Sequence, residues 1–318
     1  MKRIISITVS LIILAIIYWK IDFASLIQVF KNSNISWMVV SLCMVVPITT
    51  ITAWRLQQLT PKKAQLHFGE ANKLILAASV LNMVLPSKMG DIAKAYFMRQ
   101  QGHLTGSLSL SLVVFEKTCD LLSLLLWCTF GLMFYPNKNW LFWIMTVSVG
   151  LGLFLGLLLI SSHKFAQIFF IFIKAIAPKK LKNKIQKLQF SWEEMHRYFW
   201  QDKAQLLKIT LTSIFIWFLH LLQIWFFILA LKAWTPFLAN LALSPLAILA
   251  GLLPLTFAGV GTRDAALIAF YQPYFTAPTA AALGLLCTSR YLLPAIGGLP
   301  FLGQYLTAIR NLPTEKSK

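Results

Sequence analysis

Residues 140–160 read WLFWIMTVSVGLGLFLGLLLI, a stretch of 21 residues without a charge. A helix of about 20 apolar residues is long enough to cross the roughly 30 Å hydrocarbon core of a bilayer. The rest of the chain has the same character, because 58% of its 318 residues are hydrophobic and 12% are charged. Soluble domains carry about twice that fraction of charge. The sequence therefore predicts an integral membrane protein.

Further apolar segments predict an all-α, polytopic membrane helical bundle that forms a single integral membrane domain over residues 1–318. One segment is apolar only from Leu74 to Pro86, and 13 residues of helix reach about 20 Å, too short to span. This segment and a second one like it are predicted as broken, re-entrant helical hairpins. The expected spans are 4–19, 36–54, 74–98 (re-entrant), 108–135, 140–160, 206–231, 241–271 (re-entrant) and 277–309 (broken).

The distribution of the net charge of +19 predicts which membrane face is cytoplasmic. The stretch 161–205 is rich in lysine, whereas the connections expected on the opposite face hold only Lys20, Lys31, Lys138 and Lys232. Because basic residues gather in cytoplasmic loops, both termini are expected in the cytoplasm. Apolar residues at helical spacing within 161–205 predict an interfacial helix on an anionic phospholipid surface, with a partner-binding helix as the alternative.

Several classes of function are not indicated. The four cysteines and five histidines are scattered, so no metal site and no cofactor are expected. A nucleic-acid role would need a soluble domain with interleaved basic and aromatic residues, and none is present. The chain has no nucleophile elbow, Walker loop or dinucleotide fingerprint, so no catalytic residue is assigned.

The two broken segments resemble each other, since in both a proline is followed by glycine and aspartate. On the charge-based topology they enter from opposite faces, which is the pattern of an inverted repeat with a midplane site. Two unrelated proline and glycine kinks are the alternative. The predicted structural breaks are Asn82, Pro86 and Pro254.

Ionisable residues inside the apolar segments are the first candidate functional residues. A charge at the bilayer centre costs about 2.5 kcal/mol or more and normally faces a partner or a wet cavity. Glu116 and Asp120 lie one helical turn apart, and Lys117 can neutralise Asp120 locally. An interfacial charge cluster without chemistry is the alternative. Charge pairing or proton coupling is predicted for Asp91, Glu116, Lys117, Asp120 and Asp264.

Basic residues and glycines near the breaks are the second set of candidates. A helix that starts after a glycine offers free N–H groups and a positive dipole end to a phosphate. An arginine can add two parallel hydrogen bonds, and glycines let backbone approach a ligand closely, with a tight turn as the alternative. Lipid head-group binding is predicted for Lys88, Lys94, Arg263, Arg290, Gly90, Gly259 and Gly261.

Taken together, these motifs resemble the lysylphosphatidylglycerol synthase membrane-domain family, also called flippase-like. The resemblance covers most of the chain and keeps the family's order of motifs. Its residues are Asn82, Leu85-Pro86, Lys88, Gly90-Asp91, Lys94, Glu116-Lys117, Asp120, Pro254, Gly259, Gly261 and Arg263-Asp264. The family often has arginine where this chain has Lys88, Lys94 and Lys117. The sign of the charge is kept there, but lysine cannot clamp a phosphate with two nitrogens.

The resemblance implies a domain that moves or presents lipids across the bacterial inner (plasma) membrane. The chain ends at Lys318 without the aminoacyl-transferase domain of the full synthases, so aminoacyl transfer is not expected. The leading hypothesis is a lipid translocase, rather than an enzyme, for an anionic or polyprenyl-phosphate-linked lipid, and an enzyme is not excluded. A membrane-embedded transferase or accessory subunit in lipid or glycolipid biosynthesis is the alternative. A scaffold whose basic loop recruits a partner, such as an enzyme of lipid biosynthesis, is the third interpretation.

Overall fold

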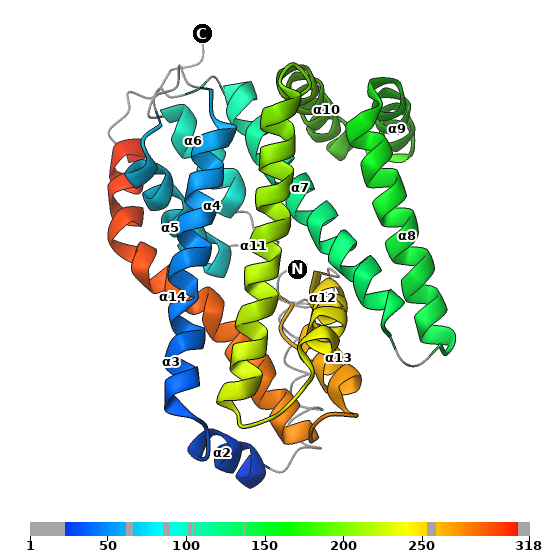
Figure 1. The fold of residues 1–318 in the computed structure, drawn as a ribbon. Coiled ribbons are helices and arrows are strands. Elements are labelled where there is room, and N and C mark those ends of the chain that lie inside the picture. The colour runs from blue at the N-terminus through cyan, green and yellow to red at the C-terminus, as the bar shows by residue number, and fades with distance from the viewer. Residues whose placement is uncertain are drawn as a thin grey trace. The chain divides into compact units, whose positions relative to one another are not determined.

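The computed structural model describes residues 23–61, 66–84, 90–100, 104, 106–135, 138–252 and 259–310. Within these ranges the chain is helical and contains no strand (Figure 1). Four helical segments of this part are long and apolar enough to cross a membrane: Ile35–Leu59, Trp140–Ser161, Lys203–Ala230 and Ala277–Gly303. The prediction of an all-α, polytopic helical bundle is confirmed.

The helices of the described residues are α2 (Phe23–Lys31), α3 (Ile35–Cys43), α4 (Val45–Leu59), α5 (Phe68–Val84), α6 (Gly90–Gln100), α7 (Gly106–Met133), α8 (Trp140–Ser161), α9 (His163–Ile176), α10 (Lys179–Phe199), α11 (Lys203–Ala230), α12 (Phe237–Leu252), α13 (Thr262–Tyr271) and α14 (Ala277–Arg310). Two of them begin at asparagine caps. The Asn34 side chain accepts from the Trp37 N–H before α3, and the Asn139 side chain accepts from the Phe142 N–H before α8. Such caps satisfy backbone donors that the first helical turn leaves unpaired.

The chain divides into two compact units. Unit 1 comprises Met1–Ile48, Thr118–Phe169 and Thr210–Arg290, and unit 2 comprises Thr49–Lys117, Phe170–Ile209 and Tyr291–Lys318. Each unit has a hydrophobic core. The core of unit 1 is built mainly from α7, α11, α12, α13 and α14, and the core of unit 2 from α4, α5 and α6.

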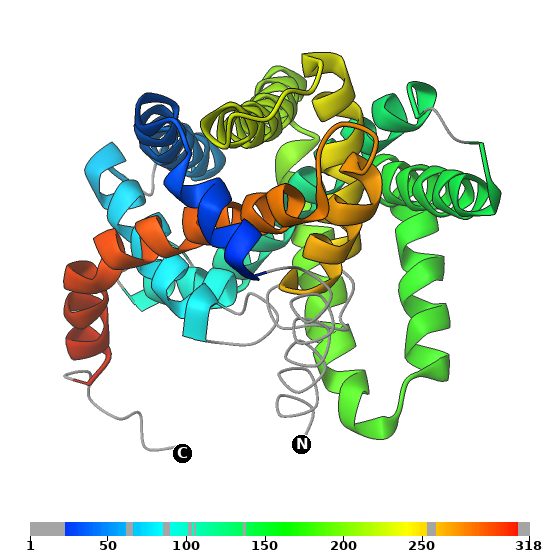
Figure 2. The same ribbon diagram turned by 90° about the horizontal axis from the view of Figure 1, so that it is seen from below.

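Both predicted breaks separate a pair of helices that pack against each other: α5 with α6 in unit 2, and α12 with α13 in unit 1 (Figures 1 and 2). Contacts at both ends show that α12 and α13 are antiparallel. Gly251, near the end of α12, faces Arg263 at the start of α13, and Tyr271 at the end of α13 bonds to Asn240 near the start of α12. The entry of the two hairpins from opposite membrane faces stays a prediction.

Glycines bring the helices of each hairpin together. A Cβ atom on Gly90, the first residue of α6, would lie 2.3 Å from the backbone oxygen of Ala78 in α5. Gly259 has a φ of +75°, and a Cβ there would lie 2.6 Å from the backbone oxygen of Gly251. Only glycine combines this close approach with the left-handed backbone. These two candidate ligand-binding glycines therefore form helix contacts within their own hairpins.

The structure differs from the expected break in the last apolar segment, because α14 runs from Ala277 to Arg310 with Pro294 and Pro300 inside it. Proline removes one helical hydrogen bond and kinks a helix, and neighbouring groups in membrane helices compensate for the lost bond. Gly298 lies against α5, where a Cβ would be 2.1 Å from the backbone oxygen of Leu76. The glycine that indicated a break serves close packing in unit 2.

The basic stretch 161–205 forms two helices, α9 and α10, with Pro178 between them. Within unit 2, Phe170 of α9 packs against Trp192 of α10 with ring centroids 6.3 Å apart. Lys174 of α9 also lies within hydrogen-bond distance of Gln186 of α10, at 3.4 Å. The two helices thus form a hairpin, where the sequence indicated a loop with one helix in it.

We expect Tyr271→Phe to weaken the α12–α13 hairpin. The buried Tyr271 hydroxyl lies 2.9 Å from Asn240 Oδ1 and 2.8 Å from the Ser244 hydroxyl. The Asn240 amide also donates to the backbone oxygen of Leu221 in α11, at 2.9 Å. Loss of the hydroxyl should lower the free energy of unfolding by about 1–3 kcal/mol, measured by thermal unfolding in detergent. Tyr274→Phe is the control, and equal losses in both variants would contradict the assignment.

Candidate functional site

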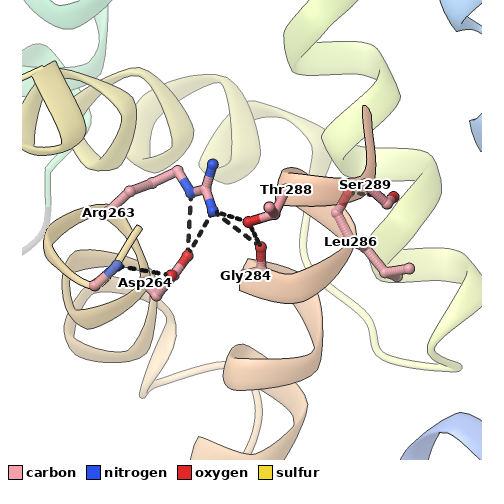
Figure 3. A network of polar contacts seen from close by, with 7 residues as sticks. Arg263, Asp264, Gly284, Leu286, Thr288 and Ser289 are labelled. Atoms are coloured by element: carbon pink, nitrogen blue, oxygen red, sulfur yellow. Dashed lines mark hydrogen bonds and ion pairs between the residues drawn. The ribbon is translucent and has the colours of Figure 1, made fainter. Parts of the chain in front are cut away.

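Among the residues that the structure describes, ionisable side chains gather in two clusters, one in each unit. The Glu116 cluster of unit 2 consists of Arg55, Asp91, Lys94, Glu116 and Lys117. The Arg263 cluster of unit 1 is centred on Arg263 and Asp264 and includes contacts to α14 (Figure 3). Charges in apolar helices are costly unless they are paired, so both clusters need a structural or functional explanation.

Glu116 lies between two buried cations. Arg55 Nη2 donates to Glu116 Oε1 at 3.1 Å, and Lys94 Nζ pairs with Glu116 Oε2. The exposed fractions of Arg55, Lys94 and Glu116 are 2%, 0% and 1%. The three residues belong to α4, α6 and α7, so one carboxylate connects three helices of unit 2.

Asp91 and Lys117 form the accessible edge of the Glu116 cluster. Asp91 lies in the first turn of α6, where the helix dipole favours a negative charge. Its carboxylate is 3.3 Å from Lys117 Nζ and 4.0 Å from Lys94 Nζ. The side chain of Lys117 is 43% exposed, whereas that of Lys94 is 1% exposed. The Lys117–Asp91 pair is thus the part of the cluster that an outside group can reach.

Arg263 ties α13 to α14 in unit 1, as Figure 3 shows. Its Nε and Nη2 donate to Asp264 Oδ1 at 3.1 and 2.8 Å. The same Nη2 lies 3.0 Å from the Gly284 backbone oxygen and 2.7 Å from the Thr288 hydroxyl. The other carboxylate oxygen of Asp264 accepts from the Gly261 N–H at 3.0 Å. The first turn of α13 is therefore held by a charge-assisted network.

Close packing surrounds this network. A Cβ on Gly284 would lie 2.7 Å from Asp264 Oδ1, so the glycine lets α14 approach the carboxylate. Gly261 has a φ of +101°, which an L side chain would strain, and it caps α13. Arg290, further along α14, is 4% exposed. Two of the predicted head-group residues, Arg263 and Arg290, are thus buried cations in unit 1.

The structure gathers most, but not all, of the predicted site residues. Asp91, Lys94, Glu116 and Lys117 lie together in unit 2, with Asn82 where α5 meets α6. Arg263, Asp264 and Gly261 lie together in unit 1, and Asp120 belongs to the α7 segment of that unit. Three predicted residues fall outside the described ranges: Lys88, Pro86 and Pro254.

Sequence reasoning missed Arg55 and Thr288. Arg55 directly follows the apolar segment 36–54, so the sequence alone favours a place in the basic connection after that span. The structure continues α4 to Leu59 and buries Arg55 against Glu116. Arg55 lies seven residues before the next basic residue, Lys62, and this separation could have indicated that Arg55 does not belong to the basic connection. Nothing in the sequence distinguishes Thr288 from other threonines.

The described residues contain no group of three histidine, cysteine or acidic side chains that could hold a metal ion. Comparison with family models gives a match to the one described as the lysylphosphatidylglycerol synthase TM region, over residues 3–298. Comparison with curated proteins finds no match.

Proposed function

The chain belongs to the lysylphosphatidylglycerol synthase TM region family, and from this premise we propose that it translocates a lipid with an anionic or polyprenyl-phosphate-linked head group. The family and the apolar helices place the protein in a membrane. The bacterial inner membrane, with both termini in the cytoplasm, is part of the proposal. It rests on the family and on the lysine-rich stretch 161–205.

The observation that carries the proposal is the gathering of three bases in the Glu116 cluster, with Lys117 exposed at its edge. Its ion pairs join three bases, Arg55, Lys94 and Lys117, to two acids, Asp91 and Glu116. The named pairs thus bring three cations together at one place in unit 2. Lysine and arginine bind phosphate, and hydrogen bonds to a charged phosphate are stronger than those between neutral groups.

The exposed side chain of Lys117 supports a route by which the lipid head group reaches the Glu116 cluster. Lys117 is exposed and pairs with Asp91 at the edge of the cluster, so a phosphate can take over the position of the Asp91 carboxylate. One ion pair is then exchanged for another, and no lysine is left uncompensated. Lys94 and Arg55 keep Glu116 as their partner during the exchange. The buried pairs of Glu116 with Arg55 and Lys94 hold the helices in place while the Lys117–Asp91 pair separates.

The same geometry speaks against proton transfer by Glu116. Each of its two oxygens already accepts from a cation, Arg55 on one side and Lys94 on the other. A general base needs an oxygen that can reach the proton it removes. This arrangement supports a charge-pairing role for Glu116, which favours lipid movement over the transferase alternative.

The test is a flipping assay with purified protein in liposomes, using a fluorescent phosphatidylglycerol and a reductant that bleaches only the outer leaflet. Lys117→Gln should slow flipping about tenfold or more, because a charge-assisted hydrogen bond to the head group is lost. Lys138→Gln is the matched control, since Lys138 is an exposed lysine just before α8. A Lys117→Gln protein with the wild-type rate would contradict this role of the cluster.

The same preparation separates the translocase from the transferase. A transferase would convert a donor lipid into a new product, and mass spectrometry of the liposome lipids would detect it. Flipping without any new lipid species is the result expected here. A new species that depends on the protein would overturn the proposal.

A further inference from the structure

The α9–α10 hairpin presents an exposed apolar stripe. Ile168, Ile171, Phe172 and Ile176 of α9 are 65%, 64%, 63% and 69% exposed. Their spacing of three to four residues places them on one face of the helix. Phe190 of α10 is also exposed. A helix of 14 residues is about 21 Å long, so α9 is too short to span a bilayer.

A run of lysines accompanies this stripe. Between positions 163 and 187 the sequence has seven lysines and no acidic residue. Lys164 and Lys187 are exposed. Amphipathic helices with this composition lie in the bilayer interface, with the apolar face among the acyl chains and the lysines near anionic head groups. The charge and the apolar stripe together fit an anionic lipid surface.

The same hairpin touches α7 directly beside Glu116. Phe199 of α10 stacks on Phe115 of α7, with ring centroids 3.9 Å apart and planes 16° apart. Both rings are buried, and Phe115 is the residue before Glu116. One turn earlier on α7, the Ser111 hydroxyl lies 3.4 Å from the Glu194 carboxylate of α10. A change in the position of α10 is therefore transmitted to the turn of α7 that carries Glu116.

We propose that the α9–α10 hairpin docks on anionic lipid and that this docking holds α7 in the position in which Glu116 pairs with Arg55 and Lys94. The hairpin thereby regulates the Glu116 cluster according to the surface charge of the membrane. The regulatory consequence rests on the proposed function of that cluster. The docking itself rests on α9 and α10 alone.

The docking is tested by hydrogen–deuterium exchange in nanodiscs of phosphatidylcholine, with or without added phosphatidylglycerol. Amides of residues 163–200 should exchange more slowly when the anionic lipid is present. Each lysine near an anionic surface strengthens binding roughly fivefold, so Lys182→Gln/Lys187→Gln should remove most of this protection. Lys31→Gln/Lys138→Gln is the matched control, because both residues are exposed lysines outside the hairpin. Equal exchange in the two lipid compositions would overturn the docking and would favour a protein partner for the hairpin.

The coupling to α7 is tested with Phe199→Ala in the same nanodiscs. In the wild-type protein, anionic lipid should also slow exchange in residues 108–120. Phe199→Ala should keep the protection of α9 and the first half of α10 and lose that of α7. If α7 stays protected in this variant, the proposed transmission through Phe115 and Phe199 is wrong. The readout is independent of lipid flipping, so failure of the translocase proposal leaves this result interpretable.

Discussion

Glu116→Ala is expected to lower the free energy of unfolding by about 3–5 kcal/mol. Removal of one partner of a buried ion pair leaves the charge of the other partner without its counter-charge. Here the loss concerns two cations, because Arg55 and Lys94 share this carboxylate. Three helices of unit 2 meet at Glu116, so their packing should loosen together. Thermal unfolding in detergent measures the effect.

A second variant distinguishes ion pairing from packing. Lys94→Ala/Glu116→Ala leaves one buried cation where Glu116→Ala leaves two, so the double variant should be more stable than the single one. Glu193→Ala is the control, since Glu193 is a partly exposed residue of α10 that bonds to the Gln189 side chain. Its cost should be within about 0.5 kcal/mol. A double variant that is less stable than Glu116→Ala would show that side-chain packing dominates.

Arg263→Lys should reduce lipid flipping at least about tenfold while the protein stays folded, because each lost hydrogen bond to a charged group is worth about 1.5–3 kcal/mol. The substitution keeps the positive charge beside Asp264. Lysine has one nitrogen, whereas Arg263 uses Nε and Nη2 to reach Asp264, Gly284 and Thr288. The first turn of α13 should therefore lose its connection to α14.

Arg99→Lys is the matched control for this experiment, because Arg99 is an exposed arginine in the last turn of α6. Thermal unfolding of both variants separates loss of folding from loss of flipping. A wild-type flipping rate for Arg263→Lys would mean that the positive charge alone is sufficient. A large loss for Arg99→Lys would mean that the assay responds to any arginine substitution.

The family and the helical class could be predicted from the sequence, because hydrophobic length and the order of motifs are local properties of the chain. Residues 140–160 match α8 closely for this reason. The contacts of Glu116 could not be predicted, since Arg55 and Lys94 lie 61 and 22 residues before it. A one-dimensional pattern shows which charges are unusual and not which of them meet.

In the last apolar segment, 277–309, the local pattern instead predicts a break that the structure does not have. Pro294 and Gly298 are local signals for a break, and the structure nevertheless continues α14 through both. The close packing of Gly298 on α5 is a tertiary contact with a residue more than 200 positions away. Such a contact overrides a local propensity, and no pattern within the segment reveals it. The predicted inverted repeat also depends on tertiary placement and stays a prediction.

The separation of ion-pair partners along the chain also bears on how the protein is inserted during synthesis. Arg263 and Asp264 are adjacent, so their charges compensate each other as soon as the ribosome has made both. Arg55 and Lys94 are synthesised 61 and 22 residues before Glu116, the carboxylate with which both pair. The first turn of α13 thus carries both charges of its ion pair, whereas the ion pairs of α4 and α6 with Glu116 form only once α7 has been synthesised.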